Sequence, residues 1–364
     1  MTLVASAPGK LVLLGEYAVL EGAPAITMAV DRRATVQVKP RTDARCEARA
    51  PDVLEAPLRF AIGADGLPDW SAAGAAAARL NLVDEVLRGL AAEQLGVAAG
   101  SGFDLALDTS AFFDGGGASR AKLGLGSSAA LTVALASALV THAGHHQAAR
   151  DRAVWLNRLL ALHRQFQGGQ GSGVDVATSL YGGVLAYRLP GGNAAPLARP
   201  LAWPAAVHRA FIWSGCSAST PKFLSILRDW RRQSASHEAE YRARMGTLTA
   251  TAEAAVTAIE HGDAAAFIDH AGGYARELRA LGAASGVSIW SAEHEAIGAI
   301  AHAHDGVVYK PCGAGGGDVG VVFAMNPDDL AAAVSRLAAA GFAHVPLTVD
   351  PTGLRVTSTE SEEA

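Results

Sequence analysis

The chain has 364 residues, of which 50% are hydrophobic and 18% charged, and its formal net charge at pH 7 is −5. This length is sufficient for two hydrophobic cores. The negative charge gives no electrostatic reason to bind nucleic acid or an anionic membrane, and no apolar run reaches the ~18 residues of a membrane span. The cysteines, Cys46, Cys216 and Cys312, are too widely spaced for a disulfide framework or a zinc site.

The first residues lack the charged start and long apolar core of a signal peptide, so we expect a cytoplasmic location. A short apolar strand is predicted at residues 11–14, directly after the turn Ala7-Pro-Gly-Lys10. Lys10 at the mouth of this strand is a fixed cation that suits a developing phosphoryl charge. An ordinary surface lysine is the alternative interpretation. The segment continues as Gly15-Glu16-Tyr17.

The remainder of the first half alternates apolar runs typical of strands with segments typical of helices. Strands are predicted at residues 35–39, 103–107 and 182–189, and helices at 73–95 and 129–140. Prolines and glycines interrupt the pattern at residues 190–205, where we place the junction between two domains. The predicted N-terminal domain therefore covers residues 1–195.

The run from Lys122 to Ala130 places two glycines and two serines directly before the predicted helix. A helix N-terminus leaves backbone N–H groups unpaired and carries a partial positive charge, and glycines in front of it allow a phosphate to approach the backbone. The run therefore predicts a site for the phosphates of ATP, formed by Lys122, Gly124, Leu125, Gly126, Ser127, Ser128 and Ala129. The hydroxyls of Ser127 and Ser128 are also candidate ligands of Mg²⁺.

Two other interpretations of this run have to be considered. The spacing of Gly124, Gly126 and Ala129 also fits a dinucleotide fingerprint, but the preceding segment is polar and no acidic residue follows at the expected distance of about 20 residues. The serines could instead be plain N-caps of a core helix.

A further glycine-bearing segment, Gly171-Ser172-Gly173-Val174-Asp175, precedes a short predicted helix. A carboxylate beside a substrate hydroxyl can accept its proton while a phosphoryl group arrives, so Asp175 is a candidate catalytic base. An N-cap role for Asp175 is the alternative. The nearby stretch from His163 to Gln170 has no carboxylate, and His163 and Gln167 either face the site or form a polar helix end.

The second half is predicted to be helical over residues 222–281 and to form strands at 306–310 and 319–325. Between these strands lies the loop Gly313-Ala-Gly-Gly-Gly317, followed by Asp318. One or two glycines suffice for a hairpin, so this loop indicates close approach to a ligand. Asn326 is predicted to cap a helix that ends near Leu337. The predicted C-terminal domain covers residues 205–352, and residues 353–364 form an acidic tail that we expect to be disordered.

Together, the glycine motifs from Ala7 to Phe323 resemble those of the GHMP kinases, the family of galactokinase, homoserine kinase, mevalonate kinase and phosphomevalonate kinase. The resemblance implies an α+β fold of two domains, the first like ribosomal protein S5 and the second ferredoxin-like. It also implies an ATP-dependent phosphotransferase that uses Mg²⁺, with Lys10 and Asp175 as catalytic residues. By the same resemblance the substrate-binding residues are Glu16, Tyr17, Ser172, Gly173, Ser217, Ser219, Thr220, Gly313, Ala314, Gly315, Gly316 and Asp318.

Within the family, single residues resemble the phosphomevalonate kinases. They are Tyr17 where related kinases have histidine, Asp318 after the third glycine loop, and Ala218-Ser219-Thr220 after a tryptophan and a glycine. The resemblance implies phosphorylation of 5-phosphomevalonate, with Lys122, Ser217, Ser219 and Thr220 as candidate contacts of its phosphate. A kinase that phosphorylates an alcohol such as mevalonate stays open, as does a homodimer. A non-catalytic sensor and a decarboxylase are disfavoured because Lys10 and Asp175 are present.

Overall fold

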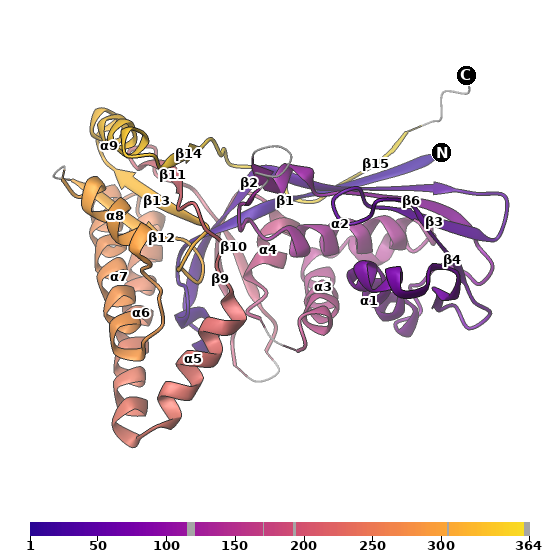
Figure 1. The fold of residues 1–364 in the computed structure, drawn as a ribbon, viewed down its shortest axis with the longest axis horizontal. Coiled ribbons are helices and arrows are strands. Elements are labelled where there is room, and N and C mark those ends of the chain that lie inside the picture. The colour runs from indigo at the N-terminus through magenta and orange to yellow at the C-terminus, as the bar shows by residue number, and fades with distance from the viewer. Residues whose placement is uncertain (115–120, 170, 192–193, 304–305, 360–364) are drawn as a thin grey trace.

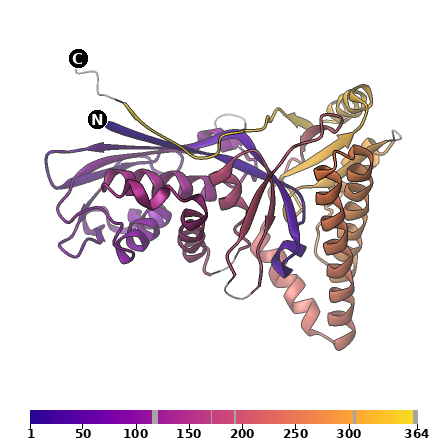
Figure 2. The ribbon, with the colours of Figure 1, turned by 180° about the vertical axis from the view of Figure 1, so that it is seen from behind.

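The computed structural model describes residues 1–114, 121–169, 171–191, 194–303 and 306–359. Figure 1 shows a large sheet with α1 to α4 on one of its faces, beside a smaller sheet that is packed with long helices from the second half of the chain. The first strand, β1, and the last described strand, β15, lie next to each other at the edge of the large sheet, as the view from behind also shows (Figure 2).

The large sheet is mixed and is organised around β2, which runs from Pro24 to Pro40. Along one side β2 pairs antiparallel with β1, and along the other side it pairs first with β9 and then with β6. From one edge to the other, the strand order is β10-β9-β2-β6-β3-β4-β5, and β1 lies off this path, paired with β2 and β15. The other strands are β1 (Thr2–Leu14), β3 (Arg45–Arg49), β4 (Leu58–Ile62), β5 (Pro68–Asp69), β6 (Phe103–Asp108), β9 (Val184–Arg188) and β10 (Leu197–Leu201).

The helices on this sheet are α1 (Asn81–Ala92), α2 (Ser127–His142), α3 (Arg152–Phe166) and α4 (Val174–Tyr181). Helix α2 packs against β1 and β2 and also contacts α1, α3 and α4, so almost all of its residues are buried. This explains why its sequence is apolar on all sides. Short elements connect these parts: η1 (Ala18–Glu21), η2 (Ser71–Leu80), η3 (Ser110–Phe112), η5 (His146–Ala149), β7 (Phe113–Asp114) and β8 (Ala121–Lys122).

The prediction of a single helix over residues 73–95 was wrong for its first part. The α-helix begins only at Asn81, after the irregular 3₁₀ segment η2. Gly74 adopts φ 56° and ψ −141°, which is incompatible with a helix. The alanine-rich composition favoured a helix here, but this glycine interrupts it.

The smaller sheet is antiparallel in the order β12-β13-β11-β14. Helices α7 and α8 pack against β12, α6 packs along α7, and α9 packs against β11 and β13. The strands are β11 (His208–Trp213), β12 (Val307–Pro311), β13 (Val319–Ala324) and β14 (Ala343–Val345). The helices are α5 (Thr220–Arg232), α6 (Ala235–Glu260), α7 (Ala264–Ser285), α8 (Ala292–Ala301) and α9 (Pro327–Ala339).

The predicted cap at Asn326 is confirmed, because its side chain accepts a hydrogen bond of 2.9 Å from the backbone N–H of Asp328. In the part of the chain that the structure describes, no helix is both long and apolar enough to cross a membrane.

The expectation of a disordered tail from residue 353 was wrong for residues 355–359. These residues form β15 (Arg355–Thr359), which pairs antiparallel with β1, with Thr359 opposite Thr2. The segment contains valine and threonine, which favour strands, and the free edge of β1 provides backbone hydrogen-bond partners. Residues 360–364 lie outside the described residues.

The chain therefore returns to the large sheet after β14. Asp350 forms an ion pair with Arg33 of β2, and the N–H of Leu354 donates to the carbonyl of Leu180 at the end of α4. Strand β10, residues 197–201, also belongs to the large sheet, although the sequence placed the end of the first domain at residue 195.

Candidate functional site

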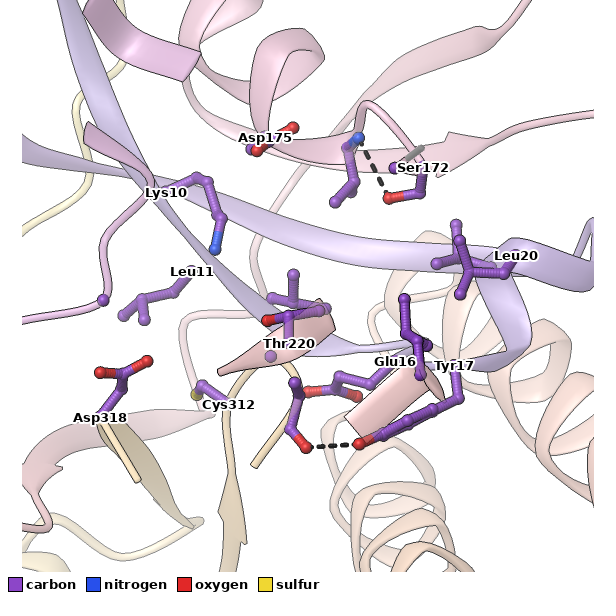
Figure 3. A pocket seen from close by; sticks show the side chains of 18 of the residues that line it. Lys10, Leu11, Glu16, Tyr17, Leu20, Ser172, Asp175, Thr220, Cys312 and Asp318 are labelled. Atoms are coloured by element: carbon purple, nitrogen blue, oxygen red, sulfur yellow. Dashed lines mark hydrogen bonds between the residues drawn. The ribbon is translucent and has the colours of Figure 1, made fainter. Parts of the chain in front are cut away.

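A cavity of about 370 Å³ lies where β1, the start of α4, the start of α5 and the loop between β12 and β13 meet (Figure 3). Among the predicted site residues, those that line this cavity are Lys10, Glu16, Tyr17, Gly124, Ser172, Asp175, Thr220, Gly313, Ala314 and Asp318. Residues from every predicted motif thus come together in one place.

The glycine run before α2 forms a tight loop that exposes the helix N-terminus. Gly124 and Gly126 have φ values of 71° and 74°, a region that favours glycine. Gly126 is the N-cap of α2, and within the described chain no side chain caps this helix. The N-cap interpretation of Ser127 and Ser128 was therefore wrong. The N–H groups of the first turn can bind an anion.

Strand β1 holds this loop in place and delivers Lys10 beside it. The backbone N–H of Lys10 donates to the carbonyl of Leu125 at 2.8 Å. A Cβ atom added at Gly126 would lie 3.1 Å from Cε of Lys10 and 3.7 Å from Cβ of Asp175. The two predicted catalytic side chains therefore border the position where a phosphate would approach Gly126.

Asp175 lies in the first turn of α4, whose N-cap is Gly173, so the N-cap interpretation of Asp175 was also wrong. Its Oδ1 accepts a hydrogen bond of 2.9 Å from the N–H of Val176. The preceding loop is fixed by the hydroxyl of Tyr187, which donates to the carbonyl of Ser172 at 2.6 Å. A Cβ atom at Gly173 would overlap the side chain of Leu160, so Gly173 serves packing, whereas Ser172 lines the cavity.

A second carboxylate, Asp318, lies on the other side of Lys10 (Figure 3). Its backbone takes the left-handed conformation, with φ 58°, and its N–H donates to the carbonyl of Cys216 at 2.7 Å. The carboxylate packs over Gly124, where an added Cβ atom would overlap it. Burial raises the pKa of Asp318, and the positive charge of Lys10 opposes that rise.

A buried ion pair joins the segment Gly15-Glu16-Tyr17 to β12, the strand that precedes the loop Gly313–Gly317. Nζ of Lys310 in β12 donates to Oε1 of Glu16, and the two side chains are 0% and 2% exposed. Burial raises the pKa of Glu16, and Lys310 opposes this. Sequence reasoning missed Lys310. The available signal was a lysine within an otherwise apolar strand.

Tyrosine hydroxyls strengthen this junction. The hydroxyl of Tyr17 donates to the carbonyl of Ala314 at 2.6 Å (Figure 3), and that of Tyr274 in α7 donates to the carbonyl of Glu16 at 2.6 Å. Tyr17 adopts φ 61°. Residues 15–17 are therefore hydrogen-bonded both to the loop between β12 and β13 and to helix α7.

The glycines of the third loop differ in their surroundings. Cβ atoms at Gly315 and Gly316 would overlap the carbonyl of Ile289 and the ring of Phe223, and both residues lie outside the cavity lining. The structure therefore does not bring them to the cavity, although the sequence predicted substrate contacts for both. Gly313 and Ala314 do line it.

The two serines predicted to hold a metal lie at the start of α2. Oγ of Ser128 lies 3.2 Å from Nε2 of His163, which is buried in α3, and Gln167 from the same region lines the cavity. Gln167 thus reaches the cavity, whereas His163 contacts Ser128, and neither of these two lines the cavity. No group of three or more His, Cys, Asp or Glu side chains suited to a metal is found among the described residues. The oxygens of Ser128, Asp175 and the phosphates of a nucleotide are nonetheless the ligand type that Mg²⁺ prefers.

Of the candidate contacts for an acceptor phosphate, Thr220 lines the cavity. Ser217 is exposed, and its hydroxyl donates to the carbonyl of Lys122 at 3.5 Å, while Lys122 and Ser219 are also exposed. Residues 228–232 at the end of α5 are rich in arginine and could in principle contact an anionic substrate, but Arg231 already has partners. Arg231 pairs with Glu238 and Glu21 and lies 3.8 Å above the ring of Tyr241.

Comparisons with known proteins agree with this geometry. The family profile described as GHMP kinases N terminal domain matches residues 81–183. The phosphomevalonate kinase of Streptomyces sp. strain CL190 is 33% identical over 95% of this chain and 97% of its own length. A mevalonate kinase of Aeropyrum pernix is 35% identical over half of each chain.

Solved structures show the same fold. The Lin0012 protein of Listeria innocua superposes with a TM-score of 0.83 at 24% identity, covering 99% of this chain and 100% of that one. Phosphomevalonate kinase of Streptococcus pneumoniae, solved in complex with phosphomevalonate and AMPPNP, superposes with a TM-score of 0.73 at 17% identity, covering 95% and 99%.

Proposed function

The chain belongs to the GHMP kinase family, and from that premise we propose that it transfers the γ-phosphoryl group of ATP to the phosphate of 5-phosphomevalonate, forming 5-diphosphomevalonate. The observation that carries phosphoryl transfer is the convergence of Lys10 and Asp175 on Gly126, at the uncapped N-terminus of α2. The choice of acceptor rests on the similarity to the Streptomyces phosphomevalonate kinase over nearly the whole of both chains.

Each part of the site has a distinct task in this reaction. The backbone N–H groups at the start of α2 bind ATP phosphates, and Lys10 neutralises charge on the group in transfer. A phosphate monoester has its second pKa near ~6, so the acceptor is mostly ionised at neutral pH. Asp175 therefore has little to deprotonate, and its main task is to hold Lys10 and the metal ion in position for the phosphates.

We propose Mg²⁺ as the metal of the reaction. Ser127 and Ser128 are the predicted ligands, supplemented by Asp175, the ATP phosphates and water, because this ion usually keeps several waters. When bound, the ion neutralises phosphate charge. The hydrogen-bond distance between Ser128 and His163 supports this assignment, since His163 would fix the orientation of the hydroxyl.

Mevalonate is the second candidate acceptor, because mevalonate kinases from archaea are 27–35% identical over 50–63% of this chain. An alcohol needs a base, and Asp175 could act as one. The shorter coverage of these relatives places this alternative second. A cytoplasmic location and a homodimer stay predictions from the sequence.

Product analysis separates the two acceptors. The purified chain is incubated with ATP, Mg²⁺ and either 5-phosphomevalonate or mevalonate, and phosphorus NMR identifies the product. We expect, beside the doublets of the ADP that is released, a second pair of diphosphate doublets from the product of 5-phosphomevalonate, with loss of its phosphomonoester signal. A phosphomonoester formed from mevalonate, with 5-phosphomevalonate left unchanged, would overturn the proposal. The variants Lys10→Met and Asp175→Asn serve as controls that the signal comes from this site.

A further inference from the structure

One wall of the cavity is formed by a carboxylate that is only half satisfied. Oε1 of Glu16 accepts a hydrogen bond from Nζ of Lys310, which also donates to the carbonyl of Pro311 at 2.7 Å. Glu16 lines the cavity, whereas Lys310 is fully buried behind it. Lys310 therefore holds one oxygen of Glu16 from a fully buried position, while Glu16 itself belongs to the cavity lining.

The second oxygen of Glu16, Oε2, is buried and has no hydrogen-bond partner among the described residues. A buried polar atom without a partner is destabilising, and in native structures each such atom calls for a specific explanation. A ligand in the cavity that Glu16 lines would supply the missing partner.

The ammonium group of Lys310 determines what that partner can be. Nζ of Lys310 donates to Oε1 of Glu16, so the two groups form an ammonium–carboxylate contact, although burial raises the pKa of Glu16. A carboxylate in such a contact only accepts hydrogen bonds. The hydrogen bond from Tyr274 to the carbonyl of Glu16 and that from Tyr17 to Ala314 fix the backbone around it. Oε2 is thus a rigidly placed acceptor that fits a donor and repels an anion.

The proposed acceptor substrate has one permanent donor. 5-Phosphomevalonate carries a carboxylate, a phosphate and a tertiary hydroxyl, and near neutral pH only the hydroxyl regularly donates a hydrogen bond. We propose that Lys310 is a positioning residue that presents Oε2 of Glu16 to this hydroxyl. The hydroxyl thereby becomes a determinant of acceptor specificity, and this inference rests on the proposed function.

The test compares two acceptors in three proteins. One acceptor is 5-phosphomevalonate, and the other is its analogue with hydrogen in place of the tertiary hydroxyl. Lys310→Met removes the ammonium group but leaves an unpaired buried carboxylate, which can prevent folding. The second variant therefore combines Glu16→Gln with Lys310→Met. Both replacement side chains are similar in shape to the originals and carry no charge, so no unpaired charge is left buried. Lys39→Met, at an exposed lysine of β2, is the matched control.

We expect the wild type and Lys39→Met to prefer the hydroxyl-bearing acceptor by about tenfold to a hundredfold in kcat/KM, as for a hydrogen bond to a charged group. In the double variant this preference falls about tenfold, through a higher KM for 5-phosphomevalonate and an unchanged KM for the analogue.

An equal loss on both acceptors, or an unchanged preference, would show that the ion pair only fastens the two motifs together, and either result overturns the inference. Absence of product from 5-phosphomevalonate with the wild type would instead remove the proposed function on which the inference rests.

Discussion

The loop before α2 and the loop between β12 and β13 look alike in sequence, yet their glycines serve different purposes. Around Gly124 and Gly126 the nearest atoms belong to the charged side chains of Asp318, Lys10 and Asp175. Around Gly315 and Gly316 they include the backbone carbonyls of Ile289 and Ser288 and the ring of Phe223. The glycines of the loop before α2 lie against charged side chains of the site, whereas the central glycines of the loop between β12 and β13 pack against backbone and an aromatic ring.

This difference shows that a glycine-rich pattern alone does not identify a ligand site. In the loop between β12 and β13, the positions that line the cavity are at its two ends, Gly313 and Ala314 at the start and Asp318 at the end. The central glycines let the loop pack against the segment before α8. The loop therefore contributes to the site through these three positions and to the fold through its central glycines.

The largest effect is expected next to the first loop, at Asp175. Asp175→Asn removes the negative charge that holds Lys10 and the metal ion in position, and we expect kcat to fall about 10²-fold with a phosphate acceptor, or up to about 10⁴-fold with an alcohol that needs a base. Steady-state kinetics with each acceptor measures this, and calorimetry with metal-free ATP should show unchanged nucleotide affinity. Unchanged turnover would remove Asp175 from the mechanism and weaken the contrast between the loops.

The next prediction concerns the third loop, where a substitution should affect stability rather than nucleotide use. Gly315→Ala places a methyl group onto the carbonyl of Ile289 at φ 74°, so we expect the free energy of unfolding to fall by about 2–4 kcal/mol. Urea denaturation measures the loss.

Gly313→Ala is the matched control for Gly315→Ala. Gly313 has a similar φ of 69°, but a Cβ atom there would meet nothing within 4 Å. Only the backbone strain applies, about 1 kcal/mol. Equal losses in the two variants would contradict the packing role assigned to Gly315.

Much of the candidate site could be predicted from the sequence, because its motifs combine glycines with charged residues in short segments. The turn predicted at residues 7–10 was wrong, because β1 runs through them to Leu14, and α4 begins at Val174 rather than after Asp175. The structure nevertheless brings Lys10, Asp175 and the loop before α2 together. The fold class follows from the same motifs through the family.

Other features could not be predicted, because they depend on contacts between distant parts of the chain. The pairing of Lys310 with Glu16 joins residues 294 positions apart. The pairing of β15 with β1 depends on a free strand edge that the sequence of the tail does not reveal. The packing of Gly315 against Ile289 likewise depends on where α8 and its preceding segment lie.

A third prediction uses pH to test how the third loop is held. His294 in α8 is buried, accepts a hydrogen bond of 2.6 Å from Tyr309, and donates one of 3.0 Å to the carbonyl of Gly317. Burial lowers the pKa of His294 to about 4. Because the unfolded chain binds this proton near its ordinary pKa of ~6.5, stability is complete above pH ~6.5 and is lost as the pH falls to about 4, by about 3 kcal/mol.

Unfolding in urea at several pH values measures this, with His294→Gln as the comparison. The raised pKa values of Glu16 and Asp318 act in the opposite direction, because these folded-state carboxyls take up protons more readily. The informative quantity is therefore the difference between wild type and variant. A difference that stays constant from pH 7 to pH 4 would show that His294 does not anchor the loop through its neutral form.

The smallest effect is expected from Gly126→Ala, and it sharpens the comparison most directly. The added methyl group would lie 3.1 Å from Cε of Lys10, a flexible side chain that can move aside, so the stability loss should be limited to about 1 kcal/mol of backbone strain at φ 74°. The displaced Lys10 and the narrowed approach to α2 should weaken ATP binding about tenfold. Calorimetric titration with a non-hydrolysable ATP analogue, beside urea denaturation, measures both quantities. Since Gly315→Ala should show the reverse pattern, a stability loss at Gly126 with normal nucleotide affinity would mean that both loops serve only the fold.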